Sequence, residues 1–203
     1  MLESRRQNLY SIIMTKLYFR YGAMNSGKST AVLQVAHNYE ERGMKVLIMK
    51  PAVDTKGDDQ IDSRIGKSRK VDALITPEDL IRNHIKTKVD CIITDEAQFF
   101  TPKQIDEFFD IAVKDNIPVI CYGLRTDFQT QLFPGAQRLF ALSHSLEELK
   151  TICRCGKKAM MNARKVNNIF VFKGDQVAID GVLKVAYESL CGTCYLDEQL
   201  RKL

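Results

Sequence analysis

Residues 16–30 read KLYFRYGAMNSGKST, and this stretch decides the fold. Within it, residues 22–29 match the pattern G-x-x-x-x-G-K-[ST], which is specific when a strand precedes it and a helix follows it. The aromatic run before the first glycine predicts the strand. Apolar residues at helical spacing predict the helix, at Val32, Val35, Ala36 and Tyr39. A glycine turn with an incidental lysine is the alternative, and this context disfavours it.

The residue types of this loop suit a nucleoside triphosphate. Glycines let the backbone curl so that successive N–H groups point at phosphate oxygens, and the helix N-terminus adds the positive end of a dipole. Lys28 is expected to reach the β- and γ-phosphates, and the Ser29 hydroxyl to bind Mg²⁺. The predicted ATP-binding residues of the loop are Gly22, Ala23, Met24, Asn25, Ser26, Gly27, Lys28 and Ser29.

The first half of the chain alternates strands with helices. Short apolar runs predict further buried strands, at residues 45–50, 89–94 and 117–122. The helix after Ser29 is expected to end near Gly43, and Thr-Pro pairs predict helix starts at Thr76 and Thr101. Continuous apolar strands between helices require a parallel sheet that is covered on both faces. We therefore expect an α/β fold, a P-loop parallel sheet flanked by helices, with ligands at the carboxyl edge of the strands.

Residues 51–70 are rich in Asp, Lys, Gly and Ser and show no clear period. They are predicted to form a long loop, and loops of this length are commonly functional.

Residues 91–96 read CIITDE, an apolar strand that ends in two carboxylates. Beside a phosphate-binding loop, Asp95 is predicted to bind Mg²⁺ directly or through water, and Glu96 to accept a proton from the attacking group. An acidic loop start is the alternative, and the buried strand favours the functional interpretation. A glutamate here activates water or a substrate hydroxyl equally well, so the pattern predicts phosphoryl transfer or ATP hydrolysis without deciding between them.

Four of the six cysteines fall in two tight pairs, a C-x-C at 153–155 and a C-x₂-C at 191–194. Without a secretory signal, six cysteines argue against a disulfide framework. Four thiolates suit a tetrahedral, structural Zn²⁺ with Cys153, Cys155, Cys191 and Cys194 as ligands, and buried free thiols are the alternative. Zinc would stabilise a segment of about 50 residues that has little apolar content.

Length and composition limit the remaining possibilities. A chain of 203 residues, 45% hydrophobic and 27% charged, suits one globular α/β core with a small appendage. No apolar run approaches the ~20 residues that span a bilayer, and residues 1–13 lack a secretory signal, so we expect a cytoplasmic protein without a membrane partner. A net charge of +5 suits anionic ligands, but no basic block is long enough to predict a nucleic-acid partner.

Taken together, these motifs resemble the thymidine kinase family that joins a P-loop domain to a zinc-bearing lobe, in its bacterial branch. The resemblance covers about residues 14 to 195. Its most specific motifs are GAMNSGKST, the run DEAQF at 95–99, GLRTDFQ at 123–129 and the cysteine pairs. The alternation of strands and helices stops near Lys150, where we place a domain boundary. With the resemblance, the chain is expected to comprise an N-terminal extension at 1–13, a P-loop kinase domain at 14–150 and a zinc-binding lobe with a substrate-closing loop at 151–203.

The resemblance implies that ATP and thymidine give ADP and thymidine monophosphate. It makes Glu96 the general base for the 5′-hydroxyl, and Arg64 an arginine of a flexible loop that approaches the phosphates. It adds Ala97 and Gln98 to the ATP-binding set with Asp95 and Glu96. It also assigns a thymine pocket to Met24, Leu124, Phe128, Phe133 and Tyr187, the last within a closing loop at 178–189.

Spacing alone leaves blander alternatives open for several of these residues. Phe128 and Phe133 fit ordinary core aromatics, Arg64 fits a solvated loop charge, and Tyr187 fits a residue of the zinc lobe. The resemblance further implies a homotetramer that is inhibited by its end-product triphosphate. Two other functions are compatible with the motifs: a nucleic-acid-dependent ATPase whose zinc lobe binds DNA or RNA, and a nucleotide-binding module without catalysis.

Overall fold

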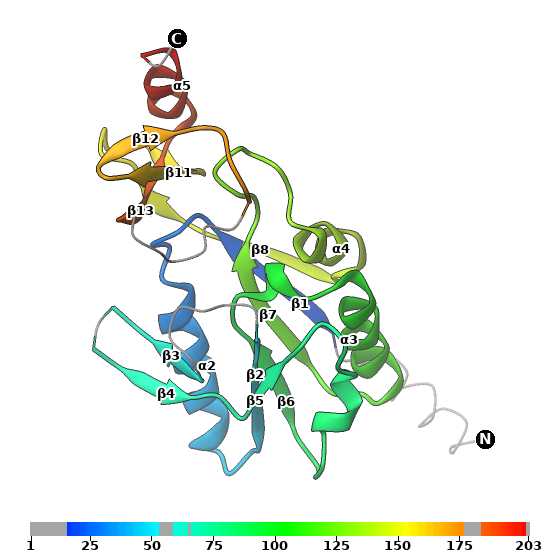
Figure 1. Cartoon of the computed structure of the whole chain (residues 1–203). Helices are drawn as coiled ribbons and strands as arrows, with labels where there is room; N and C mark the ends of the chain where they lie inside the picture. The colour runs from blue at the N-terminus through cyan, green and yellow to red at the C-terminus, as the bar shows by residue number, and fades with distance from the viewer. Residues whose placement is uncertain (1–15, 53–58, 65, 177–183, 202–203) are drawn as a thin grey trace, which may run out of the picture.

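The computed structural model describes residues 16–52, 59–64, 66–176 and 184–201, which form an α/β domain carrying a smaller lobe (Figure 1). Six parallel strands make the central sheet in the order β5-β2-β6-β7-β1-β8. Their bounds are β1 Leu17–Gly22, β2 Val46–Pro51, β5 Ala73–Ile75, β6 Cys91–Thr94, β7 Val119–Leu124 and β8 Ser145–Leu149. The predicted parallel sheet is confirmed, and the predicted extension at 1–13 lies outside the described residues.

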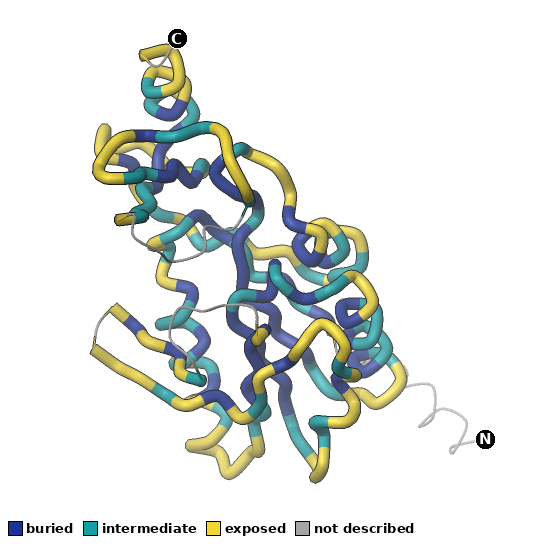
Figure 2. Tube along the Cα trace, in the orientation of Figure 1, coloured by how far each residue is buried: buried dark blue, intermediate teal, exposed yellow. Residues whose placement is uncertain are grey.

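Helices cover both faces of this sheet (Figure 1). Helix α2 (Lys28–Glu40) packs on one face, where Val32 and Ala36 meet Cys91 and Ile93 of β6. Helices α3 (Pro102–Lys114) and α4 (Pro134–Leu142) cover the other face, which includes Ile92. Figure 2 shows the strands as the buried centre of this domain. Since β6 is buried on both faces, its sequence is continuously apolar rather than alternating.

The prediction of a loop across residues 51–70 is wrong in part. Two short strands, β3 (Gln60–Asp62) and β4 (Ser68–Lys70), pair antiparallel as a hairpin. Ile61 is the buried residue of β3, whereas its neighbours face solvent. Strands of three residues are too short to give a recognisable alternation. Residues 53–58 and 65 lie outside the described part of the chain.

The predicted helix starting at Thr76 is also wrong. Residues 76–79 form a turn in which the Asp79 N–H bonds to the Thr76 carbonyl, and only a short 3-10 helix, η1 (Ile81–His84), follows. Side chains of α3 form hydrogen bonds with backbone N–H and carbonyl groups that would otherwise pair within a helix. The amide of Gln104 donates to the carbonyls of Thr76 and Asp79, and the Glu107 carboxylate accepts the N–H groups of Ile81 and Arg82.

The predicted start of α3 at Thr101 is confirmed. The Thr101 hydroxyl accepts the N–H of Gln104 at 3.2 Å, and the Gln104 side chain accepts the Thr101 N–H at 3.0 Å. This reciprocal pair is a capping box, with Pro102 at the first helical position.

After Leu149 the chain forms the smaller lobe. Its strands are β9 (Thr151–Ile152), β10 (Lys158–Ala159), β11 (Met161–Val166), β12 (Ile169–Val171) and β13 (Val185–Leu190), and it ends in α5 (Gly192–Leu200). Strand β11 pairs antiparallel with both β12 and β13. A small apolar cluster that includes Phe170, Leu190 and Tyr195 lies among these elements.

Part of the predicted closing loop at 178–189 is strand. Residues 185–189 belong to β13, and Tyr187 stands opposite Arg164 of β11. Residues 177–183 lie outside the described chain. The sequence analysis did not predict helices α4 and α5 or strands β5, β8, β9, β10 and β11.

The capping box gives a stability prediction. Replacing Thr101 by Ala removes the side-chain acceptor for an N–H at the start of α3, so we expect the free energy of unfolding to fall by about 1 kcal/mol. Thr101→Ser keeps a hydroxyl and is expected to retain most of the stability. Urea unfolding followed by circular dichroism measures both variants. Equal stability of the Ala variant and the wild type would show that the cap contributes nothing.

Candidate active site

The phosphate-binding loop leaves β1 at Gly22 and enters α2 at Lys28. A Cβ atom at Gly22 would lie 2.4 Å from the Ser26 side chain and 2.6 Å from the Leu149 carbonyl, so only glycine fits where β1 meets its neighbour β8. Asn25 and Gly27 both have left-handed backbones, with φ of 64° and 81°. These two reversals curl the loop around the start of the helix, as an anion-binding loop requires.

Lys28 lies buried inside this loop. Its ammonium donates to the Ala23 carbonyl at 2.9 Å. Burial lowers the pKa of Lys28, and the carboxylates of Glu96 and Asp95 oppose that effect. The loop therefore contains a positive charge that is removed from water and faces two carboxylates at the end of β6, two strands away in the sheet.

Asp95 closes the other side of the site. It is 3% exposed, and it accepts the Ser29 hydroxyl at 3.0 Å and the backbone N–H of Glu96 at 2.9 Å. Burial raises the pKa of Asp95, while these two hydrogen bonds and the lysines at 28 and 50 counteract the rise. A carboxylate and a hydroxyl in contact are oxygen ligands of the kind that Mg²⁺ prefers.

Glu96 follows in a left-handed conformation with φ of 50°, which is uncommon for a residue other than glycine. The Gln98 amide donates to its carboxylate at 2.6 Å and accepts the Leu124 N–H at 2.8 Å. A Cβ at Gly123 would lie 2.8 Å from the same Gln98 oxygen, so a larger residue there would displace the Gln98 side chain from this position. Gln98 therefore fixes Glu96 against the end of the adjacent strand.

The residues assigned to the thymine pocket come from the phosphate-binding loop, from the segment between the end of β7 and the start of α4, and from β13. Phe128 follows β7 and is 1% exposed, with the Arg164 guanidinium 3.7 Å above its ring centre. Arg164 also donates to the Tyr187 hydroxyl at 3.0 Å, so it joins two of the predicted residues. Phe133 is buried in the main core, where its ring packs edge-on against Phe99. The structure thus links Phe128 and Tyr187 through Arg164, a residue that was not predicted to belong to the site.

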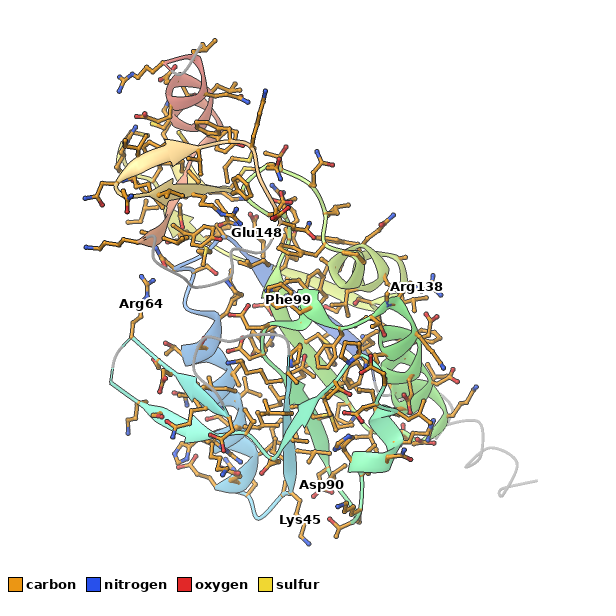
Figure 3. All side chains as sticks on the ribbon, in the orientation of Figure 1. Lys45, Arg64, Asp90, Phe99, Arg138 and Glu148 are labelled. Atoms are coloured by element: carbon orange, nitrogen blue, oxygen red, sulfur yellow. The ribbon has the colours of Figure 1, made fainter. Side chains whose placement is uncertain are left out.

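Arg64 stands apart from these contacts. It is exposed at the free end of the β3–β4 hairpin (Figure 3). The preceding Ser63 is buried and its hydroxyl contacts that of Thr30 at 2.6 Å, which attaches the hairpin to the first turn of α2. The guanidinium lies near enough to contribute to the lowered pKa of Lys28.

Comparison with known proteins identifies this arrangement. The family model described as thymidine kinase matches residues 15–195. A thymidine kinase of Legionella pneumophila is 46% identical over 190 residues, which is 90% of this chain and 88% of that protein. A thymidine kinase of Chromobacterium violaceum is 45% identical and covers 90% of this chain and 98% of its own length. A thymidine kinase of Photorhabdus laumondii is 44% identical over 192 residues, which is 91% of this chain and 94% of that protein.

The chain belongs to the thymidine kinase family. The resemblance based on its motifs is thereby confirmed, in line with the α/β fold and the four-cysteine lobe.

The four paired cysteines of this thymidine kinase family member lie together. Their sulfur atoms are all within 4.8 Å of one another, and those of Cys155 and Cys191 are 3.6 Å apart. Tetrahedral Zn²⁺ with bonds of about 2.3 Å places its sulfurs roughly 3.8 Å apart, so the cluster fits zinc. The pKa of Cys191 is lowered, chiefly because the backbone N–H of Cys194 donates to its sulfur. The other two cysteines, Cys91 and Cys121, are buried in the core.

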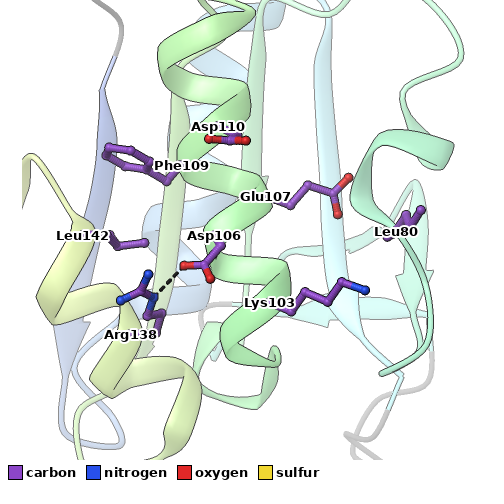
Figure 4. A pocket seen from close by; sticks show the side chains of 8 residues that line it. All are labelled: Leu80, Lys103, Asp106, Glu107, Phe109, Asp110, Arg138 and Leu142. Carbon is purple, nitrogen blue, oxygen red and sulfur yellow. Dashed lines mark hydrogen bonds and ion pairs between the residues drawn. The ribbon is translucent and has the colours of Figure 1, made fainter.

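One surface hollow is unrelated to this chemistry. It measures about 420 Å³ and lies between α3, α4 and the residue before η1 (Figure 4). Its lining is Leu80, Lys103, Asp106, Glu107, Phe109, Asp110, Arg138 and Leu142, with an ion pair between Arg138 and Asp106. It includes none of the predicted site residues of the thymidine kinase family.

Two further residues of the lobe lie at the site although the sequence did not predict a role for them. Asn162 and Ser189 both hydrogen-bond to the backbone of Met24 in the phosphate-binding loop. No motif marks them, since an isolated Asn or Ser on a short strand carries no signal of its own. Both are more than nine-tenths buried, and only the folded structure brings them to the loop.

The cysteine cluster predicts a metal-content change. Cys153→Ser removes one of four thiolates, so zinc measured in the purified protein should fall from about one equivalent to a small fraction. Cys91→Ala alters a core cysteine and should leave the zinc content unchanged, although it lowers stability. Elemental analysis after gel filtration separates the two. Full zinc content in the Cys153 variant would contradict a four-cysteine site.

Proposed function

We propose that this chain transfers the γ-phosphate of ATP to the 5′-hydroxyl of thymidine. Family membership supports this function. The observation that carries it is the cluster in which Lys28 and Ser29 of the phosphate-binding loop face Asp95 and Glu96 at the end of β6. That cluster unites a phosphate cradle, a cation site and a proton acceptor at the carboxyl edge of one parallel sheet.

Each residue then has a distinct role. The loop N–H groups and the Lys28 ammonium stabilise negative charge on the transferred phosphoryl group. Glu96 accepts the proton of the 5′-hydroxyl as that oxygen attacks the phosphorus. The Gln98 amide, which donates to Glu96, orients the carboxylate for this step. The exposed Arg64 approaches the phosphates from the hairpin, a role that comes from the resemblance.

Two metals complete the proposal. Asp95 and the Ser29 hydroxyl are the residues that would bind Mg²⁺, and the ion would supply positive charge that stabilises the negatively charged phosphates. The cysteine cluster would bind Zn²⁺ as a closed structural site. In a lobe whose apolar cluster is small, such a site stabilises the fold rather than the reaction.

The nucleoside is proposed to lie among Met24, Leu124, Phe128, Phe133 and Tyr187. The Arg164 guanidinium covers one face of the Phe128 ring and the ring is 1% exposed, so Phe128 would support the base through the packing of the pocket wall. Phe133 acts through the packing of this region, because its ring is engaged in the core.

Several finer properties stay predictions. The resemblance implies the homotetramer and inhibition by the end-product triphosphate, and the sequence pattern predicts a cytoplasmic location and the division of the chain near Lys150. Light scattering of the purified protein tests the tetramer, and a mass of one chain would exclude it. Among the described residues, no helix is both long and apolar enough to cross a bilayer.

Glu96→Gln tests the general base. Gln keeps the shape but does not accept the proton, so kcat for thymidine phosphorylation should fall by roughly 10² to 10⁴ while ADP affinity is largely kept. Glu78→Gln, at an exposed position outside the predicted site, serves as the matched control and should behave like the wild type. An unchanged kcat in the Glu96 variant would favour a nucleotide-binding module without catalysis.

A nucleoside panel tests the reaction itself. Purified protein with MgATP should form the monophosphate from thymidine, with little product from deoxycytidine or deoxyadenosine; chromatography of the products measures this. Deoxyuridine in the same panel reports how far the site distinguishes the methyl group of thymine. If ATP is hydrolysed only when DNA or RNA is added and no nucleoside reacts, the nucleic-acid-dependent ATPase replaces this proposal.

A further inference from the structure

The backbone of the phosphate-binding loop is bonded to side chains of the smaller lobe. The Met24 N–H donates to the Asn162 side chain at 2.8 Å, and the Ser189 hydroxyl donates to the Met24 carbonyl. Asn162 on β11 and Ser189 on β13 are direct partners in the register of the two strands. One cross-strand pair therefore contacts both polar backbone groups of a single loop residue.

The first of these bonds acts on the peptide group that contacts Lys28. The carbonyl of Ala23 and the N–H of Met24 belong to one planar peptide. That carbonyl accepts the Lys28 ammonium at 2.9 Å, while the N–H donates to Asn162. Rotation of this plane would break both bonds at once, so Asn162 fixes the carbonyl that positions the lysine.

The second bond acts on the next peptide group. The carbonyl of Met24, which accepts the Ser189 hydroxyl, precedes Asn25, whose φ of 64° lies in the left-handed region. Such a conformation persists only where surrounding contacts stabilise it. The Thr151 hydroxyl adds a third lobe contact, to the Asn25 carbonyl at 3.2 Å.

The surroundings make these bonds strong constraints. Asn162 is 3% exposed and Ser189 is 6% exposed, so neither side chain has free access to water in place of its partner. The other end of the Asn162 amide donates to the Thr126 carbonyl at 2.9 Å, two residues before Phe128. The same side chain thus ties the phosphate-binding loop to the loop that follows β7.

We propose that Asn162 and Ser189 are positioning residues of the ATP site, which fix the peptide groups on either side of Met24 and thereby the ammonium of Lys28. The smaller lobe then has two roles: it fixes the geometry of the phosphate-binding loop, and it contributes Tyr187 to the proposed nucleoside pocket. The inference rests on the proposed function in one respect, namely that ATP is the ligand of this loop.

The test compares Ser189→Ala with Ser189→Thr. The Ala variant loses the donor to the Met24 carbonyl, whereas Thr keeps a hydroxyl on a strand position that suits a β-branched residue. We expect Ser189→Ala to weaken MgADP binding, measured by calorimetry, about 5- to 10-fold and to lower kcat about 10-fold. The Michaelis constant for thymidine should change less than about 3-fold, and Ser189→Thr should stay within about 3-fold of the wild type throughout.

Asn162→Leu is the second variant. It keeps the volume of the side chain but removes the bonds to Met24 and Thr126, so it should weaken MgADP binding at least as much as Ser189→Ala. Ser143→Ala is the matched control, because the Ser143 hydroxyl is buried and makes no hydrogen bond within the described residues. Thermal melting and zinc content of each variant confirm that the lobe is folded.

The outcomes separate the two proposals. Wild-type MgADP affinity and kcat in both folded variants would overturn the positioning role, even if the protein phosphorylates thymidine. Loss of affinity in Ser189→Thr equal to that in Ser189→Ala would also overturn it, since the hydroxyl would then be irrelevant. If the wild type binds MgADP but phosphorylates no nucleoside, the proposed function fails, while the effect of Ser189→Ala on MgADP affinity still decides the positioning role.

Discussion

The buried ammonium of Lys28 is the constraint on which the rest of the domain depends. A charge removed from water requires compensation nearby, and here a backbone carbonyl at 2.9 Å and the carboxylates of Asp95 and Glu96 provide it. The carboxylates reach the lysine because β1 and β6 are parallel, with β7 between them, so that their carboxyl ends meet at one edge. Helices on both faces of the sheet then exclude water from the strands that carry these groups.

Close backbone contacts keep this edge compact. Gly22 and Gly123 sit where a Cβ would collide with Ser26, Leu149 or Gln98. Gln98 uses the space at Gly123 to link Glu96 with β7. The Glu96 carboxylate is thus oriented by Gln98 of the short 3-10 helix η2 (Ala97–Phe99), which is itself bonded to the end of β7.

The sequence predicted the features whose physics is local or periodic. The phosphate-binding loop, the capping box at Thr101 and the doubly buried strand at Cys91–Thr94 each carry a short pattern that one chain segment fully determines. The prediction of a helix at Thr76 was wrong although its Thr-Pro pair is typical of a helix start. The backbone groups of this segment hydrogen-bond instead to the side chains of Gln104 and Glu107 in α3. Arg164, Asn162 and Ser189 were beyond prediction, since each acts through contacts with residues far away along the chain.

The contacts from the lobe also affect when, during synthesis, the nucleotide site can form. The phosphate-binding loop lies near the beginning of the sequence, and its partner Ser189 is separated from Met24 by 165 positions. The strand that flanks Gly22, β8, ends only at Leu149. During synthesis the glycines and lysine of the loop therefore leave the ribosome long before the groups that shape them. A nascent chain lacks its finished nucleotide site until the lobe has been made, which ties acquisition of activity to completion of nearly the whole fold.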